Sequence, residues 1–292
     1  MVKKCLLLYS NGLDSRLCLK IMQEKGYSVF GVYFKLPFSK DFSEEAKEFF
    51  KENSASLKIL DYTKGKKLND YLDVILKHRF NFGSGLNPCF DCKIFMFKKA
   101  KEIAEKEGID LIVSGEVLGQ RPMSQTENGL KLIENNSDLK GKILRPLSEK
   151  ILSNVKEVDS KEYFDFSGRQ RKLQISLADK FGIKYPLPAG GCLLCERYLR
   201  KRFEFLIKGD FIDGKTVKMI NIGRHFNIDG DWFVVSKDEE ESNIIEEFNN
   251  SLPSSSKVPA VYFSNSSKKE IAIRLQKAYK EKKPVLFEEY KL

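Results

Sequence analysis

The chain has 292 residues, of which 41% are hydrophobic and 32% are charged. This composition is typical of a globular protein with one large or two modest domains. No apolar run approaches the roughly 20 residues that a membrane-spanning helix needs, and the opening MVKKCLLLYS is too short for a signal peptide. We therefore expect a cytoplasmic protein and exclude the membrane and secreted classes.

The charge balance is basic and uneven. Lys and Arg number 51 against 41 Asp and Glu, a net charge of +10, of which residues 1–195 carry +8. Each phosphate that a basic surface contacts releases counterions, so this balance suits a polyanionic partner such as RNA. A lysine-rich solvated surface would give the same totals, and charge alone does not decide between the two.

The first part of the chain alternates between short apolar runs, which predict buried strands, and segments with helical spacing of apolar residues. Gly26 and Gly108 stand where C-terminal caps close two of the helices. This alternation predicts an α/β fold with a parallel sheet that helices cover on both faces. In chain order we expect strand 5–10, helix 13–26, strand 27–36, helix 41–54, strand 57–63, helices at about 66–79 and 93–107, and strand 110–116.

The alternation of predicted strands and helices ends after the next predicted helix, at 168–182. The Pro- and Gly-rich stretch YPLPAGGCLLCE (185–196) indicates a domain border. Beyond it, RHFNI and WFVVS flank Asp229-Gly230, a hairpin signal, and a strand at 258–264 and a helix at about 268–282 follow. We therefore predict a larger domain at 1–195 and a smaller α+β domain at 196–292.

Six cysteines fall into two groups. Cys5 and Cys18 stand in apolar surroundings and are expected to be small core residues. The other four form two C-x-x-C pairs, at 89/92 and at 192/195. In an intracellular protein such pairs more often bind a metal or do redox chemistry than form structural disulfides.

The first predicted strand runs into a turn of small residues, Ser10–Ser15, and then a helix. Such a turn directs backbone N–H groups and hydroxyls at phosphate. Asp14 could hold Mg²⁺, or it could cap the helix. The sequence S-N-G-L-D-S resembles the S-G-G-x-D-S loop of the PP-loop ATP pyrophosphatases. That resemblance implies a HUP-like, Rossmann-type domain that cleaves ATP between its α and β phosphates, with the nucleotide on Ser10, Asn11, Gly12, Asp14 and Ser15.

Asn11 departs from the family pattern, which has Gly at this position. Asn adopts left-handed backbone conformations less readily than Gly, so the departure bears on the geometry of the loop. Tyr33 and Phe34 end the second predicted strand, where PP-loop enzymes hold adenine. A core role is equally natural for Phe34.

Three further segments deepen the resemblance. Ser114–Gln120, with Ser124–Thr126 and Leu144–Leu147, resembles the G-E-x-L-G-Q, S-Q-T and R-P-L segments of the tRNA 4-thiouridine synthetases. Asn87–Lys93 resembles the C-x-x-C-K of their archaeal members and occupies the place of a catalytic Cys in the 2-thiouridylases. The similarity covers about residues 5–150. It implies an ATP-dependent tRNA sulfurtransferase that adenylates a uridine carbonyl oxygen and replaces it with sulfur, with 4-thiouridine favoured over 2-thiouridine, and it adds Ser114, Gly115 and Gln120 to the nucleotide site.

The cysteine pairs leave several chemistries open. Four thiolates could hold one zinc ion, and a pair could work as persulfide and resolving thiol. Similarity to cluster-dependent tRNA thiolation enzymes favours a [4Fe-4S] cluster on Cys89, Cys92 and Cys192, with one iron left open for sulfide. Cys195 would be a fourth ligand or a reserve thiol. The expected catalytic residues are Cys89, Cys92, Cys192 and Asp14, and the expected cofactors are ATP, Mg²⁺ and the cluster, with zinc as the alternative.

Two basic clusters flank the second cysteine pair and are candidates for RNA phosphate contacts or for solvated helix faces. The region around Gly223–Phe226 loosely resembles the NFACT-R-like RNA-associated domain. We therefore expect tRNA as partner, together with a sulfur donor (sulfide or a persulfide carrier), and a second copy of the chain is a further candidate partner. The candidate RNA-binding residues are Arg169, Arg171, Lys172, Arg200, Lys201 and Arg202.

Two other interpretations stay open at this stage. A PP-loop enzyme could adenylate a small molecule while its cysteines hold zinc. A non-catalytic, zinc-stabilised RNA-binding protein would also account for the charge and the cysteine pairs.

Overall fold

The structure is a computed structural model that describes residues 3–77, 79–80, 86–186 and 192–292. These residues fall into two compact units. The first spans Asn87–Cys192 together with the chain before residue 83, and the second is formed mainly by Leu193–Leu292. None of the helices in the described ranges is long and apolar enough to cross a membrane.

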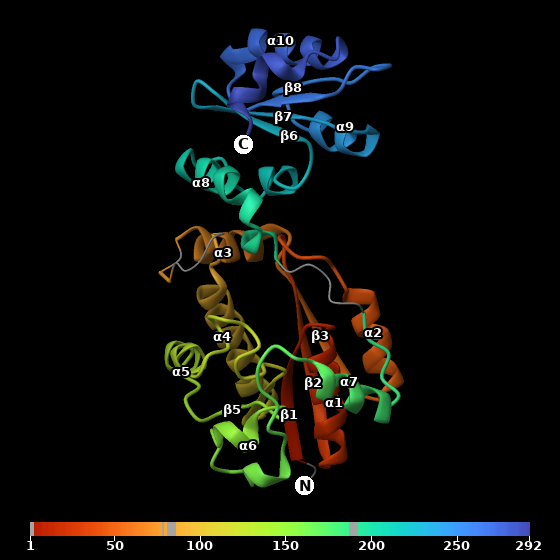
Figure 1. The fold of residues 1–292 in the computed structure, drawn as a ribbon, viewed down its shortest axis with the longest axis vertical. Coiled ribbons are helices and arrows are strands. Elements are labelled where there is room, and N and C mark those ends of the chain that lie inside the picture. Colours follow the sequence, from red (N-terminus) through yellow and green to blue (C-terminus); the bar gives the residue numbers. More distant parts are fainter. Residues whose placement is uncertain (1–2, 78, 81–85, 187–191) are drawn as a thin grey trace. The chain divides into compact units, whose positions relative to one another are not determined.

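The first unit is built on a five-stranded parallel sheet with the order β3-β2-β1-β4-β5. Helices lie on both of its faces (Figure 1). The strands are β1 (Lys3–Tyr9), β2 (Tyr27–Lys35), β3 (Ser56–Asp61), β4 (Leu111–Ser114) and β5 (Ile143–Leu144). The helices are α1 (Leu13–Glu24), α2 (Ser43–Glu52), α3 (Gly65–Leu76), α4 (Cys89–Glu107), α5 (Glu127–Asn136), α6 (Glu149–Leu152) and α7 (Lys172–Lys180), with a 3-10 turn η1 (Ser160–Glu162).

The central strand β1 is buried on both faces, which explains its continuous apolar run. Cys5 and Leu7 join a core that includes Leu17 of α1 and Leu177 of α7. Leu6 alternates to the other face, where α4 packs, and is fully buried. A strand that is covered on both faces needs no polar alternation.

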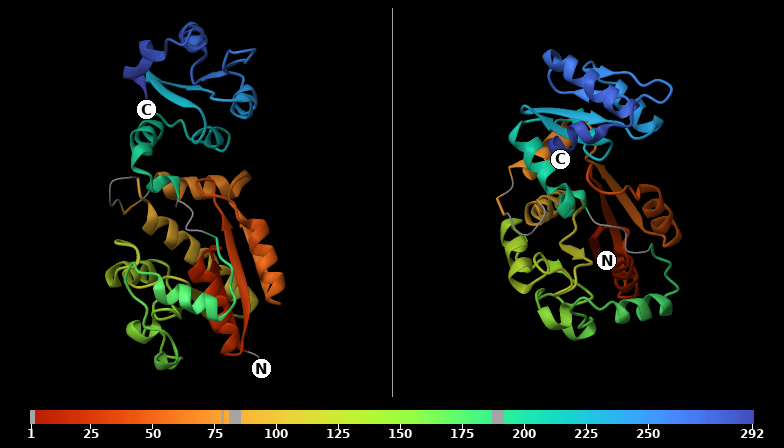
Figure 2. Two further views of the ribbon diagram at one scale, coloured as in Figure 1. Left: turned by 45° about the vertical axis from the view of Figure 1, so that its right-hand side comes forward. Right: turned by 45° about the horizontal axis from the view of Figure 1, so that its top comes forward.

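The second unit has a four-stranded antiparallel sheet, in the order β6-β7-β9-β8. Helix α10 lies on one face of it (Figure 2), and its apolar side chains belong to the same core cluster as those of the strands. Its strands are β6 (Arg224–Ile228), β7 (Asp231–Val235), β8 (Ser251–Leu252) and β9 (Val261–Phe263). Its helices are α8 (Arg200–Lys208), α9 (Glu239–Glu246) and α10 (Lys269–Lys280), with 3-10 turns η2 (Leu193–Cys195), η3 (Arg197–Leu199), η4 (Thr216–Met219), η5 (Ser266–Lys268) and η6 (Pro284–Tyr290).

The predicted fold class is confirmed: a parallel-sheet α/β unit precedes a smaller α+β unit. The hairpin lies where Asp229-Gly230 predicts it, and both residues have positive φ, 53° and 86°, as a tight hairpin turn demands. The division between the units falls between Cys192 and Leu193, whereas the sequence suggests residue 195. The NFACT-R-like, RNA-associated character of the second unit stays a prediction.

Candidate active site

Two hydrogen bonds of the Ser15 hydroxyl hold the turn between β1 and α1 together. This Oγ donates to the carbonyl oxygen of Gly12 (2.9 Å) and accepts from the backbone N–H of Ser10 (3.3 Å). Gly12, the N-cap residue of α1, offers no side chain to the first N–H groups of the helix. Asp14 lies in the first turn and is not the cap. The helix start therefore keeps donors for an external anion.

Asn11 takes the conformation that the family pattern reserves for Gly, with a φ of 64°. Its side chain is 1% exposed, and its Oδ1 accepts from Tyr9 Oη (3.0 Å) and from Arg16 Nη2 (2.7 Å). Arg16 also donates from Nη1 to the carbonyl oxygen of Lys184 (2.8 Å). The Asn side chain thus adds buried hydrogen bonds that Gly could not make, and these offset the left-handed backbone.

We expect Asn11→Ala to destabilise the protein more than Asn11→Gly. Both variants lose the bond from the charged Arg16 side chain, worth about 1.5–3 kcal/mol. Only the Ala variant also keeps the left-handed backbone penalty of about 1–2 kcal/mol. Denaturant-induced unfolding followed by circular dichroism measures the two differences. A Gly variant as stable as the natural protein would contradict a stabilising role for the Asn11 side chain.

Gly115 lets the segment after β4 approach the phosphate-binding turn closely. A Cβ at this position would lie 2.8 Å from the backbone nitrogen of Ser15 and 2.9 Å from the carbonyl carbon of Asp14. Any other residue would push the two segments apart. The Gly of the Ser114-Gly115-Glu116 motif is therefore a requirement of backbone packing at the site.

A cavity of about 480 Å³ lies over this turn within the first unit. Its wall combines the turn with the end of β2, one side of α4 and the segment after β4, and is closed by Arg171, Pro186 and Cys192. All ten residues predicted to bind the nucleotide line this one cavity, while their contacts to a nucleotide stay predictions. They are Ser10, Asn11, Gly12, Asp14, Ser15, Tyr33, Phe34, Ser114, Gly115 and Gln120.

Asp14 is the acidic group of the turn. Its Oδ2 accepts from Gln120 Nε2 (3.0 Å), whereas its Oδ1 is buried and has no hydrogen-bond partner among the described residues. Burial raises the pKa of this carboxyl, and the Gln120 bond and the charges of Arg171 and Arg121 act in the opposite direction. An orphaned carboxylate oxygen beside a phosphate-binding turn fits a Mg²⁺ ligand, because Mg²⁺ takes one or two carboxylates together with phosphate oxygens.

Tyr33 and Phe34 line the cavity from the end of β2, although both are largely buried. The Tyr33 hydroxyl accepts from the backbone N–H of Phe42 (2.8 Å). Phe34 stacks on Tyr62, with ring centroids 5.9 Å apart. Tyr33 and Phe34 thus pack in the core and also line the cavity.

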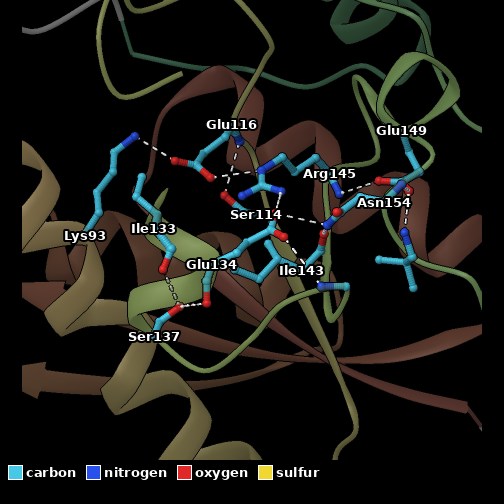
Figure 3. Close-up of polar contacts among 12 residues, drawn as sticks. Lys93, Ser114, Glu116, Ile133, Glu134, Ser137, Ile143, Arg145, Glu149 and Asn154 are labelled. Carbon is cyan, nitrogen blue, oxygen red and sulfur yellow. Dashed lines mark hydrogen bonds and ion pairs between the residues drawn. The ribbon is translucent and has the colours of Figure 1, made fainter. Parts of the chain in front are cut away.

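A buried chain of charges supports one side of the cavity (Figure 3). Lys93 of α4 contacts Glu116 Oε1 (2.7 Å), and Arg145 Nε donates to Glu116 Oε2 (3.1 Å). Arg145 Nη1 also contacts Glu134, which accepts from Asn154 Nδ2 (3.0 Å). Burial alone would raise the pKa of Glu116, but the charges of Lys93 and Arg145 outweigh it and hold that pKa below its usual value.

The ammonium group of Lys93 is thereby fixed at the cavity wall. The sequence offered a signal for this pair, since opposite charges directly follow Cys92 and Gly115 in the two motifs. The sequence does not show that Lys93 and Glu116 lie close together in the fold. The pair is therefore absent from the predicted site residues.

Cys89 and Cys92 lie in the first turn of α4, which begins four residues earlier than the sequence predicts. Pro88 is the N-cap residue, and the backbone N–H of Cys92 donates to its carbonyl oxygen (2.9 Å). The buried Tyr71 hydroxyl is 3.4 Å from Cys92 Sγ. Burial raises the pKa of Tyr71, and the charges of the neighbouring Cys92, Cys192 and Cys89 raise it further.

No group of three His, Cys, Asp or Glu side chains within the described ranges is close enough to hold a metal ion. Cys89, Cys92 and Cys192 therefore do not form a closed ligand set. Cys192 lines the cavity, whereas Cys195 belongs to the second unit and is exposed. The neighbouring sequence Ala189-Gly190-Gly191 lies outside the described residues.

The six basic candidates differ in their surroundings. Arg169, Lys172, Arg200 and Lys201 are exposed, and Arg200 is paired with Glu204 (2.6 Å). Arg202 is partly buried and donates to the carbonyl oxygen of Ile220 (3.0 Å), while Arg171 lines the cavity. Both partly buried side chains thus have structural surroundings that the sequence does not show.

Comparison with known proteins places these motifs in a family. The model of the family described as thiamine biosynthesis protein (ThiI) matches residues 1–170, more than half of the chain. The chain belongs to the ThiI family. The matched region carries the phosphate-binding turn, the first cysteine pair and the Glu116–Arg145 pair, and it ends just before Arg171.

Curated relatives of this ThiI-family chain share parts of the same region. The tRNA-specific 2-thiouridylase MnmA of Petrotoga mobilis is 32% identical over 131 residues, 40% of this chain and 36% of that protein. The tRNA sulfurtransferase of Serratia proteamaculans is 40% identical over 75 residues, 24% of this chain and 15% of that protein. The chain thus matches well under half the length of either relative.

Among solved structures, a 4-thiouridine synthetase–RNA complex with bound ATP is 19% identical to this ThiI-family chain, with a TM-score of 0.40. The match covers 74% of this chain and 53% of that one.

Proposed function

We propose that this protein is a cytoplasmic ATP-dependent tRNA sulfurtransferase. The observation that carries the proposal is one cavity whose wall contains a phosphate-binding turn, an acidic side chain with an orphaned oxygen, and the thiol of Cys192. Membership of the ThiI family, and relatives named as a tRNA sulfurtransferase and a 2-thiouridylase, support tRNA as the acceptor. The basic balance of the chain, +10, supports a polyanionic partner.

In the proposed reaction the N–H groups at the start of α1 bind the triphosphate of ATP. Asp14 would hold Mg²⁺ through its orphaned Oδ1, and the ion supplies neutralisation of phosphate charge when bound. A uridine carbonyl oxygen attacks the α-phosphate, the bond to the β-phosphate breaks, and pyrophosphate leaves. Lys93, fixed by Glu116, adds a positive charge to the same wall.

Adenylation turns the uridine oxygen into a leaving group. Hydrosulfide then adds to the same carbon, the carbon–oxygen bond breaks, and AMP leaves to give thiouridine without any change of oxidation state. With a persulfide carrier, the outer sulfur would bond to the carbon as AMP leaves. A second thiol would then attack the carrier's inner sulfur, break the sulfur–sulfur bond and form a disulfide, which releases thiouridine. The motif similarity favours 4-thiouridine, with 2-thiouridine as the second product class.

The test is anaerobic incubation of the full chain with ATP, Mg²⁺, sulfide and unmodified tRNA. Mass spectrometry of the nucleosides should show replacement of oxygen by sulfur in uridine, and chromatographic retention separates the 4-thio from the 2-thio product. Absence of thiolation by protein that binds both ATP and tRNA would contradict the proposal and favour a different acceptor.

We further propose that Cys89, Cys92 and Cys192 are the ligands of a [4Fe-4S] cluster. Cys89 and Cys92 in the first turn of α4, and Cys192 at the cavity wall, support the grouping. The described thiols form no closed set of three, and no step above depends on the cluster. Such a cluster would present an iron to sulfide.

Serine variants of the cysteines test this ligand set. We expect Cys89→Ser, Cys92→Ser and Cys192→Ser each to lose most of the bound iron, because each removes a thiolate ligand. Cys195→Ser, the matched control, should keep its iron. Iron, sulfide and zinc per chain are measured after anaerobic purification. Bound zinc that depends equally on all four cysteines would contradict the cluster and favour a structural zinc site.

We also propose that the exposed Arg169, Lys172, Arg200 and Lys201 contact the RNA backbone. All four side chains are exposed to solvent, and exposed basic side chains are the usual phosphate contacts of RNA-binding proteins. Removal of any one should weaken tRNA binding across sequences and reduce its salt dependence by about one counterion.

A further inference from the structure

Arg171 stands outside the segment that the family model matches, yet it lines the nucleotide cavity. It is the residue that precedes α7. The sequence groups it with Arg169 and Lys172 as an RNA-binding candidate, but those two side chains are exposed and that of Arg171 is partly buried. Arg169 and Lys172 therefore lie in solvent, whereas Arg171 lies at the cavity wall.

The backbone before Arg171 is fixed against the segment that carries Gln120. Gly168 donates its N–H to the carbonyl oxygen of Leu118 (2.7 Å), and Leu118 forms a β-bridge with Ser167. Gly119, the next residue, has a positive φ of 74° and lies close to Gly168. These contacts bring Arg171 to the wall that holds Asp14, and the positive charge of Arg171 lowers the pKa of Asp14.

The cavity wall contains a donor and several acceptors with no protein partner among the described residues. Arg171 Nε is buried and without a hydrogen bond, as are Asp14 Oδ1, Gln120 Oε1 and Gln125 Oε1. A buried unpaired donor on a charged group costs free energy unless a ligand accepts from it. Guanidinium groups match phosphate oxygens in geometry and in charge, and a cation–phosphate contact at this wall would satisfy the Arg171 donor.

We propose that Arg171 binds the triphosphate of the nucleotide rather than the RNA backbone. The inference rests on the proposed use of ATP and adds a phosphate ligand from beyond the matched family segment. Arg171 and the N–H groups of α1 would then both bind the phosphates. Asp14 would hold the Mg²⁺ that accompanies the same phosphates.

Equilibrium titration of the full chain with ATP and Mg²⁺ tests the proposal, with AMP as the comparison ligand. Arg171→Gln should lower ATP affinity about 10-fold to 100-fold, because a charge-assisted hydrogen bond to phosphate is lost. The loss should be smaller for AMP, which lacks the β and γ phosphates. Lys180→Gln, at the exposed end of α7, is the matched control and should bind ATP like the natural protein.

The outcomes separate this inference from the proposed function. If the natural chain fails to bind ATP, the proposed function itself is wrong. If Arg171→Gln binds ATP normally but binds tRNA weakly, Arg171 is an RNA residue and the inference is overturned while the function stands. Should Arg171→Gln fail to fold, Arg171→Lys decides: a several-fold loss of ATP affinity supports a guanidinium–phosphate contact, and unchanged affinity overturns it.

Discussion

Replacement of Arg145 by Met is expected to destabilise the first unit by about 3–5 kcal/mol, since it breaks a buried ion network from its centre. Arg145 is 1% exposed and contacts both Glu116 and Glu134. Without it, Glu134 keeps neutral donors, the Asn154 amide and the Gly141 N–H, and Glu116 keeps Lys93 as its one charged partner among the described residues. The negative charges of both buried carboxylates would then be only partly neutralised.

Denaturant titration of the natural protein and of Arg145→Met measures this loss. Lys150→Met is the matched control, because Lys150 forms an exposed pair with Asp165 that is worth about 0–1 kcal/mol. The triple change Arg145→Met, Glu116→Gln and Glu134→Gln should recover part of the stability, since the carboxylate charges leave with the guanidinium. A single Arg145→Met variant that is as stable as the Lys150 control would contradict a central role for the network.

The pH dependence of this variant has a defined sign. The pKa of Glu116 is lowered in the folded protein, so its ionised form stabilises the fold above the unfolded pKa, and that contribution is lost as the pH falls through the folded pKa. Arg145→Met removes one of the two charges that lower this pKa. The difference in stability between the natural protein and the variant should therefore be largest near neutral pH and smaller in acid.

The order of strands and helices in the first unit follows from local sequence because local physics decides it. The apolar run around Leu6 and Leu7 is a strand that is buried on both faces, and no tertiary contact is needed to predict it. Helix α5 is not among the predicted elements, although Thr126 caps it by accepting from the N–H of Gly129, and Leu130 and Ile133 have helical spacing. The motif interpretation covers Ser124–Thr126 and assigns no element to the residues that follow.

The site could be predicted in part. Motif similarity brings together the turn at Ser10–Ser15 and Ser114–Gln120, because both follow parallel strands at the same edge of the sheet. It could not assign Arg171, whose place in the cavity depends on the bridge between Leu118 and Ser167. Resemblance does assign Cys192 to the catalytic site, and in the structure Cys192 lines the same cavity.

Asp14→Asn is expected to remove most ATP-dependent turnover while it makes the ligand-free protein more stable at neutral pH. The variant keeps the shape of the side chain but loses the charge that Mg²⁺ requires. A metal ion supplies several kcal/mol of charge stabilisation to phosphoryl chemistry, so we expect a loss of roughly a thousandfold in kcat/KM. Asp179→Asn makes the same chemical change at an exposed position on α7 and is the matched control.

The gain in stability follows from the direction of the pKa shift. Burial raises the pKa of Asp14 in the folded protein, so the folded state binds more protons than the unfolded state as the pH rises between the two pKa values, and stability falls over that range. The Asn variant escapes this loss. Its advantage should be present near neutral pH and vanish below the unfolded pKa of an Asp, about 3.9.

The same ionisation should govern the use of the nucleotide by the natural protein. Mg²⁺-dependent ATP affinity should fall as the pH drops through the raised pKa of Asp14, because the protonated carboxyl is a poor metal ligand. ATP titrations at several pH values, with and without Mg²⁺, measure this dependence. Asp14→Asn could instead show the same Mg²⁺ dependence as the natural chain and no gain in stability. Asp14 would then be neither the metal ligand nor a carboxylate whose burial destabilises the fold, and its Oδ1 would need another partner.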